Sequence, residues 1–419
     1  MSVLLSLFER PCRRICMEYA EVHVIGGGLG GLAAAAFVAR AGHRVVVHER
    51  RGRLGGRATT DERNGYRFNQ GPHALYEGGA AMGVLRDLGI ERRGRTPPTR
   101  GAQMVLGGDL YLAPGGVGSL LRTKIIGVRD KAELASLLAR LPRIAPHDFA
   151  ERTVNEWLCD LTDRERVRAL LHAIVRLTTY TNAPDRLSAE VAIQQVQLGL
   201  GSEVRYLDGG WERLVDGLAG VVTGCGGEIR RDDGANGVPD AAAVIVAVGG
   251  PVQTAAVTGY PFPAGACAEA AVLDIALERA PRHRFVIGVD EPFYLSDHGS
   301  MEAMCPPGRS SVSLAHYLAP NEEPNRERLE VFARHAGIVT SDIADERYLH
   351  RMTTVSAIAT AASGGLAGRP PVAVPDRNGV FVVGDWVGPK GHLADAVLAS
   401  ATAAADATIA HLSTLRRVR

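Results

Sequence analysis

A cluster of glycines near the start of the chain has the spacing of a phosphate-binding turn. Gly26, Gly28 and Gly31 satisfy the pattern G-x-G-x-x-G, and Gly30 lies between the last two. In such a turn the first glycine allows a tight bend, the second lets the backbone approach a pyrophosphate, and the third lets a helix pack closely on a strand. The unpaired N–H groups at a helix N-terminus also attract anions. The pattern predicts a dinucleotide site that includes all four glycines.

Regular elements on both sides of this turn would hold it in place. Residues 21–25 form a short apolar strand, residues 32–40 an alanine-rich helix, and residues 45–47 a second strand. This order predicts a β-α-β unit in which the glycine turn joins the first strand to the helix. Glu49 follows the second strand, where a carboxylate accepts hydrogen bonds from an adenosine ribose.

The segment after the second strand carries arginines and glycines that suit a nucleotide cofactor. Guanidinium groups bind phosphate oxygens in a forked geometry, which suits Arg51 and Arg57. Gly55 and Gly56 would let the chain pass close to a cofactor. The run from Glu49 to Arg57 resembles the E-x-R-x-R-x-G-G-R motif of the amine oxidase and phytoene desaturase superfamily of flavoproteins. The resemblance implies that the dinucleotide is FAD.

A second segment resembles the part of these flavoproteins that passes the flavin ring. It contains Gly71 and Pro72, followed by His73, although Asn69 replaces the usual aspartate. The resemblance implies that Gly71 and Pro72 line the cofactor. His73 is a candidate catalytic group on the reactive side of the ring, and a turn-capping role is the alternative.

A third resemblance lies near the C-terminus. Gly384 and Asp385 follow an apolar strand at residues 379–383, and an alanine-rich helix follows them. The resemblance implies that the Gly-Asp pair meets the ribityl and phosphate part of FAD, and that the backbone at Leu393 and Ala394 faces the pyrimidine carbonyl. A helix N-terminus there would stabilise the negative charge of a reduced flavin. Because this part of the chain lacks cysteine, we expect non-covalent FAD.

The motifs occur at the beginning, middle and end of the chain. We therefore expect an α/β fold in which a Rossmann-type FAD-binding domain carries an inserted α+β substrate domain. The expected FAD-binding domain comprises residues 17–76, 205–250 and 375–412, and the substrate-binding domain comprises residues 77–204 and 251–374. Helical periodicity predominates in the first insertion. In the second insertion, residues 272–277, 284–288 and 311–317 are predicted strands and residues 326–336 a predicted helix.

One segment departs from the superfamily pattern. Its members have several more strands before the apolar strand that corresponds to residues 244–248, whereas this chain has only residues 231–242 there. We expect the small β-meander on the adenosine side to be truncated.

Composition argues against several other classes of protein. The chain has 419 residues and a net charge of +1, so no global field favours nucleic acid. The six cysteines are scattered, and histidine and cysteine lack zinc-type spacing, so we expect a reduced, cytoplasmic chain without a metal site. In residues 1–16 the positive charges follow a short apolar stretch, which argues against a secretory signal and suggests a disordered extension. Peripheral membrane contact stays open.

The scarcity of lysine bears on the reaction. Many amine oxidases of the superfamily place a lysine near flavin N5, but this chain has none between Lys131 and Lys390. This favours hydride transfer to N5 from a largely apolar small molecule, as in a desaturase or dehydrogenase. An amine oxidase, a flavin-dependent isomerase without net redox and a flavin-free binding protein are the alternatives, and the electron acceptor is not indicated. His392, at the start of the C-terminal helix, is the second catalytic candidate. Other polar candidates are Tyr76, Tyr294, His298 and His316.

Overall fold

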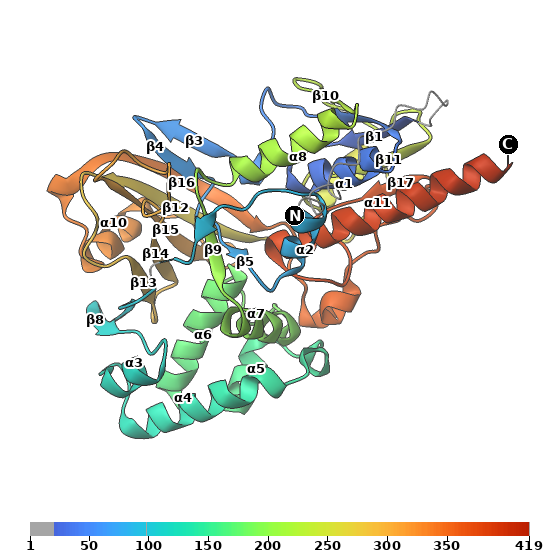
Figure 1. Cartoon of the computed structure of the whole chain (residues 1–419). Coiled ribbons are helices and arrows are strands. Elements are labelled where there is room, and N and C mark those ends of the chain that lie inside the picture. Colours follow the sequence, from blue (N-terminus) through green and yellow to red (C-terminus); the bar gives the residue numbers. More distant parts are fainter. Residues whose placement is uncertain (1–20, 98, 419) are drawn as a thin grey trace, which may run out of the picture.

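Two large sheets, of five and seven strands, and the helices packed on them make up most of the architecture (Figure 1). Two smaller sheets have two and three strands. The computed structural model describes residues 21–97 and 99–418. The predicted extension, residues 1–16, lies outside the described residues.

The first sheet is parallel, with the strand order β10-β2-β1-β11-β17. Its strands are β1 (Glu21–Ile25), β2 (Arg44–His48), β10 (Glu228–Arg230), β11 (Ala243–Val246) and β17 (Val380–Val382). Its central strands are apolar because helices and loops bury both faces of the sheet. The predicted positions of these strands are confirmed to within two residues at either end. The chain runs outward from β1 to β2 and β10, then returns to β11 on the other side of β1. Open parallel sheets commonly bind ligands at the carboxyl ends of the strands where such a reversal occurs.

Three helices pack together on one face of this sheet. They are α1 (Leu29–Arg40), α8 (Glu212–Gly224) and α11 (Leu393–Val418), and α2 (Ala80–Asp87) packs on α11. The alanines of α1 are buried, and their small size lets α8 and α11 approach closely. The two alanine-rich helices predicted from the sequence are confirmed. On the other face, α9 (Pro251–Thr258) packs near a cluster that contains Phe262 and Trp386.

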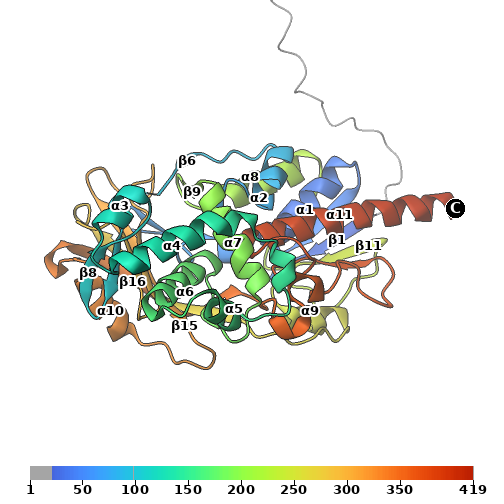
Figure 2. The same ribbon diagram turned by 90° about the horizontal axis from the view of Figure 1, so that it is seen from below.

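Helix α11 is long and apolar, and it extends beyond the rest of the chain (Figure 2). Within the described residues it is the one helix with the length and composition to cross a bilayer, and 44% of its most apolar window is buried. Since α11 packs against α1 and α2, its apolar face is explained by the core of the fold.

The second sheet has seven strands in the order β16-β12-β15-β14-β13-β7-β8. They are β7 (Gln103–Leu106), β8 (Asp109–Leu112), β12 (Ala268–Leu277), β13 (Phe285–Gly288), β14 (Phe293–Asp297), β15 (Ser310–Leu318) and β16 (Ile343–Val355). All neighbours are antiparallel except β13 and β7. Helix α10 (Arg326–His335) covers one face and buries Leu329 and Phe332 there. Strands β12, β13 and β15 and helix α10 were predicted, whereas β14 and β16 were not.

A helical layer lies against the opposite face of this sheet. It comprises α3 (Val117–Arg122), α4 (Val128–Arg140), α5 (Val154–Leu161), α6 (Glu165–Thr179) and α7 (Ala189–Gly201). Shorter strands connect the layers, namely β3 (Thr60–Arg63), β4 (Tyr66–Asn69), β5 (Leu75–Tyr76), β6 (Gly94–Arg95) and β9 (Val204–Leu207). The helical character predicted for the first insertion is confirmed.

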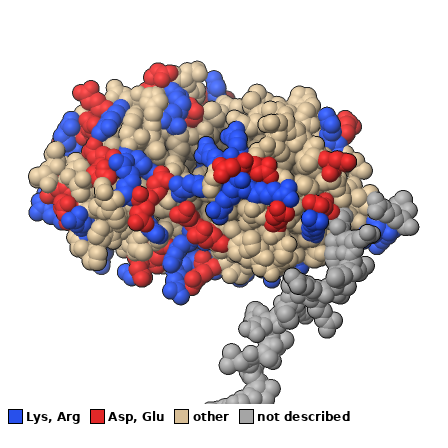
Figure 3. Space-filling model, turned by 90° about the horizontal axis from the view of Figure 1, so that it is seen from above, with Lys and Arg blue, Asp and Glu red and all other residues tan. Residues whose placement is uncertain are grey.

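Residues 231–242 contain no strand, so the truncation of the meander is confirmed. The parallel sheet draws its strands from three separate stretches of the chain, while the domain limits stay a prediction. On the face shown in Figure 3, acidic and basic side chains are intermingled, with uncharged areas between them. This mixed pattern fits the near-zero net charge.

Candidate functional site

The glycine turn joins β1 to α1 as predicted, and three of its glycines serve the packing of the fold itself. Gly26 has a φ of +109°, a region that favours glycine, and a side chain there would overlap the Ala247 carbonyl. A side chain on Gly31 would overlap the Gly26 carbonyl oxygen. A side chain on Gly30 would overlap two valines, Val383 after β17 and Val397 in α11.

Gly28 and Gly56 instead border an open space. Gly28 has an ordinary φ of −80°, and a side chain there would meet only the carbonyl oxygen of Gly55, at 3.8 Å. At Gly56, with a φ of +55°, the nearest atom would be the Gly28 Cα, at 3.9 Å. The Gly55 N–H donates to the Gly27 carbonyl over 2.8 Å and fixes these segments together. A diphosphate at the N-terminus of α1 would have room here without displacing protein atoms.

Glu49 lies just past β2 and closes the same turn. Its Oε2 accepts the Gly27 N–H at 2.8 Å, and its Oε1 accepts the Arg51 N–H at 2.9 Å. Each carboxylate oxygen keeps a further acceptor position, which suits ribose hydroxyls. The Arg51 side chain is exposed, so its predicted phosphate contact stays a prediction.

An ion pair joins the first and last motifs. Arg57 donates from Nη1 to Asp385 Oδ2 over 2.8 Å and to the Thr354 carbonyl over 3.2 Å. Asp385 is 1% exposed, whereas Arg57 is 40% exposed. Two segments at opposite ends of the chain therefore meet at one edge of the parallel sheet.

Asp385 has a second carboxylate oxygen that bears on a ligand. Oδ2 also accepts the Ser356 N–H at 3.1 Å, while the buried Oδ1 has no hydrogen-bond partner among the described residues. Burial opposes ionisation of this carboxyl, but Arg57 and Ser356 together hold its pKa below the usual value. A buried, ionised oxygen without a donor suits a ligand hydroxyl. The neighbouring Gly384 is fixed to α11, since its N–H donates to Ser400 Oγ at 3.2 Å.

The start of α11 has an unusual backbone. Leu393 has a φ of +52°, in the left-handed region, and Leu393 and Ala394 are partly exposed. His392 is buried and donates from Nε2 to the Thr179 carbonyl at the end of α6, over 2.8 Å. Burial lowers its pKa to about 4, so the imidazole is neutral near pH 7. These contacts turn His392 toward α6, and its catalytic role stays a prediction.

Arg369 is a buried cation that the sequence did not single out. Its Nη1 donates to the Gly391 carbonyl over 2.9 Å, next to His392, while Nε and Nη2 lack partners among the described residues. Burial lowers its pKa to about 10, and Asp385 opposes that change. Because Arg369 lies in an irregular segment without a recognisable motif, no local signal distinguishes it from a surface arginine.

His73 lies in the loop that joins β4 to β5. Its Nδ1 donates to the Gly71 carbonyl over 2.9 Å, and its ring lies 4.7 Å from the Trp211 ring. Burial lowers its pKa to about 4, so His73 is neutral near pH 7. Gly71 has a φ of +80°, and a side chain there would overlap Met352 of β16. This close approach brings the second sheet against the Gly71–Pro72 segment.

Buried tyrosines lie beside this segment. Tyr206 of β9 hydrogen-bonds to Tyr294 and to Ser296 of β14, each over 2.6 Å, and its ring stacks on His298 at 4.2 Å. Burial raises the pKa of Tyr206 to about 12 and lowers that of His298 to about 3, so both are neutral. Tyr294 and Ser296 share a face because side chains alternate along a strand. Tyr180 and Tyr317 meet edge to face at 5.7 Å.

Two other sequence candidates occupy different surroundings. Tyr76 is buried and donates to the Thr178 carbonyl over 3.4 Å. His316 lies on the opposite face of the second sheet, where its ring lies 4.6 Å from Phe293 under α10. Strand alternation turns His316 away from the tyrosines, which agrees with a structural role, and a role in the active site stays a prediction. Lys390, the one lysine near the C-terminal motif, is exposed.

Comparison with known proteins agrees with this geometry. Residues 24–88 match the family of NAD(P)-binding Rossmann-like domains. A limonene dehydrogenase component from Castellaniella defragrans is 33% identical over 136 residues, which cover 32% of this chain and 22% of that protein. Phytoene desaturase from Cercospora nicotianae is 42% identical over 73 residues, which cover 17% of this chain and 12% of that protein. The chain therefore matches well under two thirds of either relative's length.

A solved structure shares the fold over nearly the whole chain. Cyclohexylamine oxidase from Brevibacterium oxydans IH-35A superposes with a TM-score of 0.65, covering 95% of this chain and all of that one at 17% identity. The α/β fold with a Rossmann-type domain is confirmed. The resemblance to the amine oxidase and phytoene desaturase superfamily is confirmed as well, with sequence relatives among the desaturases and dehydrogenases and the fold of an amine oxidase.

Proposed function

We propose that this protein is an FAD-dependent oxidoreductase that takes a hydride from a largely apolar small molecule. The observation that carries the proposal is the Arg57–Asp385 ion pair beside the open space at Gly28 and Gly56. It brings the diphosphate-type turn and the Gly-Asp motif to one continuous edge of the parallel sheet. A dinucleotide that extends along this edge would contact both.

The residues present fit non-covalent FAD. Gly28 and Gly56 leave room for the diphosphate, and Glu49 offers free acceptor positions for the adenosine ribose. Asp385 Oδ1 would accept a ribityl hydroxyl, and the start of α11 would direct N–H groups at Leu393 and Ala394 toward the pyrimidine carbonyl. Gly71 and Pro72 would lie along the ring. The last cysteine of the chain, Cys305, lies far before the C-terminal motif, so no thiol is available there for a covalent bond.

Bound FAD would supply the redox chemistry by accepting two electrons and a proton from a C–H bond of the substrate. The chain's own residues would bind and orient that substrate. His73, His298 and Tyr206 are neutral near pH 7, so they offer hydrogen bonds without a net charge. A site lined by such neutral, largely buried side chains favours an apolar substrate and excludes water from the reacting bond.

The choice of an apolar substrate over an amine rests on two observations. No lysine occurs between Lys131 and Lys390, so the second sheet cannot place an ammonium group near the flavin. Among the sequence relatives are a limonene dehydrogenase component and a phytoene desaturase, whose names indicate hydrocarbon substrates. The amine oxidase fold keeps amine oxidation as the second candidate function.

Flavin content and anaerobic reduction test the proposal. We expect purified protein to release about one FAD per chain on denaturation, and a monoterpene or polyene to bleach the flavin absorbance without oxygen. Putrescine and cyclohexylamine serve as the amine panel. Bleaching by an amine alone would establish amine oxidation, while substrate rearrangement without bleaching would establish isomerisation. Protein that neither retains nor binds FAD would refute the cofactor assignment.

A further inference from the structure

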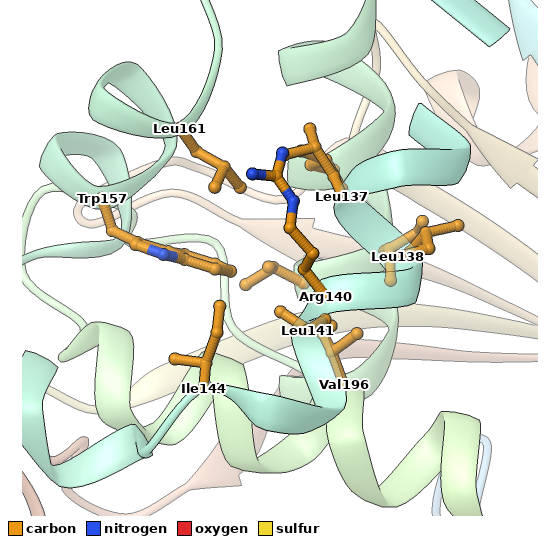
Figure 4. Close-up of a pocket in the computed structure, with 11 residues that line it drawn as sticks. Leu137, Leu138, Arg140, Leu141, Ile144, Trp157, Leu161 and Val196 are labelled. Atoms are coloured by element: carbon orange, nitrogen blue, oxygen red, sulfur yellow. The ribbon is translucent and has the colours of Figure 1, made fainter. Parts of the chain in front are cut away.

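A separate apolar cavity lies inside the helical layer, between α4, α5, α6 and α7 (Figure 4). Its volume is about 220 Å³, and ten of its eleven lining residues are apolar. They include Leu141, Trp157, Leu171 and Val196. Native cores are close-packed and leave few voids larger than a water molecule, and an apolar cavity of about 150 Å³ is already large enough to bind benzene. The cavity is therefore large enough for a ligand.

The remaining lining residue is Arg140, at the C-terminal end of α4. Figure 4 shows its side chain extending beside Leu137 and Leu161, across the cavity from the Trp157 ring. Its Nε donates a long hydrogen bond, 3.4 Å, to the Ser136 carbonyl in its own helix. Arg140 is exposed, and the one hydrogen bond that its side chain makes within the described residues is to Ser136 in its own helix. Its Nη groups can therefore bind an anion at the cavity's edge.

We infer that this cavity binds a hydrocarbon chain that ends in a carboxylate, with the chain inside and the carboxylate on Arg140. The apolar lining would oppose entry of any charged group, so the charge must stay at the edge where Arg140 lies. A medium-chain fatty acid meets both conditions. None of the lining residues belongs to the predicted FAD site, so the inference goes beyond the proposed function and does not depend on flavin binding.

A chain-length series tests the apolar part of the site. Trp157 lines the cavity and is 4% exposed, so its fluorescence reports occupancy, with calorimetry as an independent measure. Hexanoate, octanoate and decanoate are titrated into the purified protein below the concentrations at which they form micelles. Each added methylene is expected to strengthen binding about fourfold until the cavity is full. Absence of saturable decanoate binding would overturn the inference.

Two matched arginine variants test the charge. Arg140→Gln is expected to weaken decanoate binding about fivefold and to leave binding of the neutral 1-decanol unchanged. Arg143→Gln is the control, because Arg143 is also exposed and also donates to a carbonyl in α4, but does not line the cavity. Equal effects of the two variants on decanoate binding would contradict the assignment of Arg140.

A filled cavity provides the last test. Val196 of α7 lines the cavity and is 4% exposed, so Val196→Phe would occupy part of the space. We expect it to weaken decanoate and 1-decanol binding alike by more than about tenfold, since the lost volume excludes several methylenes. Unchanged binding of both ligands in folded Val196→Phe protein would locate them elsewhere and refute the site. If this variant does not fold, the comparison of Arg140→Gln with Arg143→Gln still tests the site.

Discussion

Substitutions of Gly28 and Gly31 should distinguish the residues that bind the cofactor from those that serve folding. Gly28 has a φ of −80°, which alanine adopts without strain, and the nearest atom to a new side chain would be 3.8 Å away. Alanine lowers the entropy of the unfolded chain but is a poorer helix N-cap than glycine, and these two effects offset each other. We therefore expect Gly28→Ala to change the free energy of unfolding of the FAD-free protein by less than about 0.5 kcal/mol.

The same methyl group would stand in the open space beside the N-terminus of α1. It would displace a diphosphate from the backbone N–H donors. The loss of two hydrogen bonds to a charged group, at about 1.5 kcal/mol each, weakens FAD binding by about 3 kcal/mol, or roughly a hundredfold in Kd. Gly31→Ala behaves in the opposite way, because its methyl group would overlap the Gly26 carbonyl oxygen. Overpacking against backbone lowers the free energy of unfolding by about 3 kcal/mol.

Two measurements separate these effects. Urea denaturation of the FAD-free variants reports stability, and titration of apoprotein with FAD, followed by flavin fluorescence, reports Kd. Wild-type FAD affinity in Gly28→Ala would refute the assignment of the diphosphate to this space. Destabilisation of Gly28→Ala to the extent seen in Gly31→Ala would show that both positions serve only the packing of β1 on α1.

Three further predictions concern buried polar groups. Asp385→Asn removes the ion pair with Arg57, so we expect the variant to lose FAD and to be about 2 kcal/mol less stable in urea near pH 7. Because the pKa of Asp385 is depressed in the folded protein, the stability difference between variant and wild type should vanish as the pH falls through that pKa. A difference that stays constant with pH would argue against the ion pair. Burial raises the pKa of Asp395 to about 6, so between about pH 4 and pH 6 the folded protein keeps this carboxyl protonated while the unfolded chain loses the proton. The free energy of unfolding should therefore fall by about 2 kcal/mol as the pH rises from about 4 to about 6. Asp395→Asn should remove this pH dependence, and an unchanged profile would exclude Asp395 as its source. Tyr317 is 1% exposed, and its hydroxyl has no hydrogen-bond partner among the described residues. Tyr317→Phe should therefore be as stable as the wild type in urea, or about 1 kcal/mol more stable, whereas a loss of stability would reveal a partner of the hydroxyl.

Much of the parallel sheet and its turn could be predicted because the signals are local. The bend at Gly26, the alanine face of α1 and the apolar runs of β1 and β17 each arise from a few adjacent residues. Strand β16 was missed for the converse reason. It is an edge strand that carries arginine, glutamate and aspartate, so it lacks the apolar run that identifies a buried strand. Strand β14 was missed because its polar residues Ser296 and Asp297 interrupt the apolar run after Leu295.

The amino-acid sequence by itself determined the dinucleotide-type turn, the parallel sheet and the position of the Gly-Asp motif, since backbone sterics and hydrophobic periodicity act over short distances along the chain. Only the tertiary structure decided that Arg57 pairs with Asp385, that Arg369 is buried, and that Tyr206 meets Tyr294 while His316 faces away. It also decided that four helices leave a cavity with Arg140 at its edge. These pairings join residues far apart in the chain, and their energies depend on burial and distance, which no local pattern encodes.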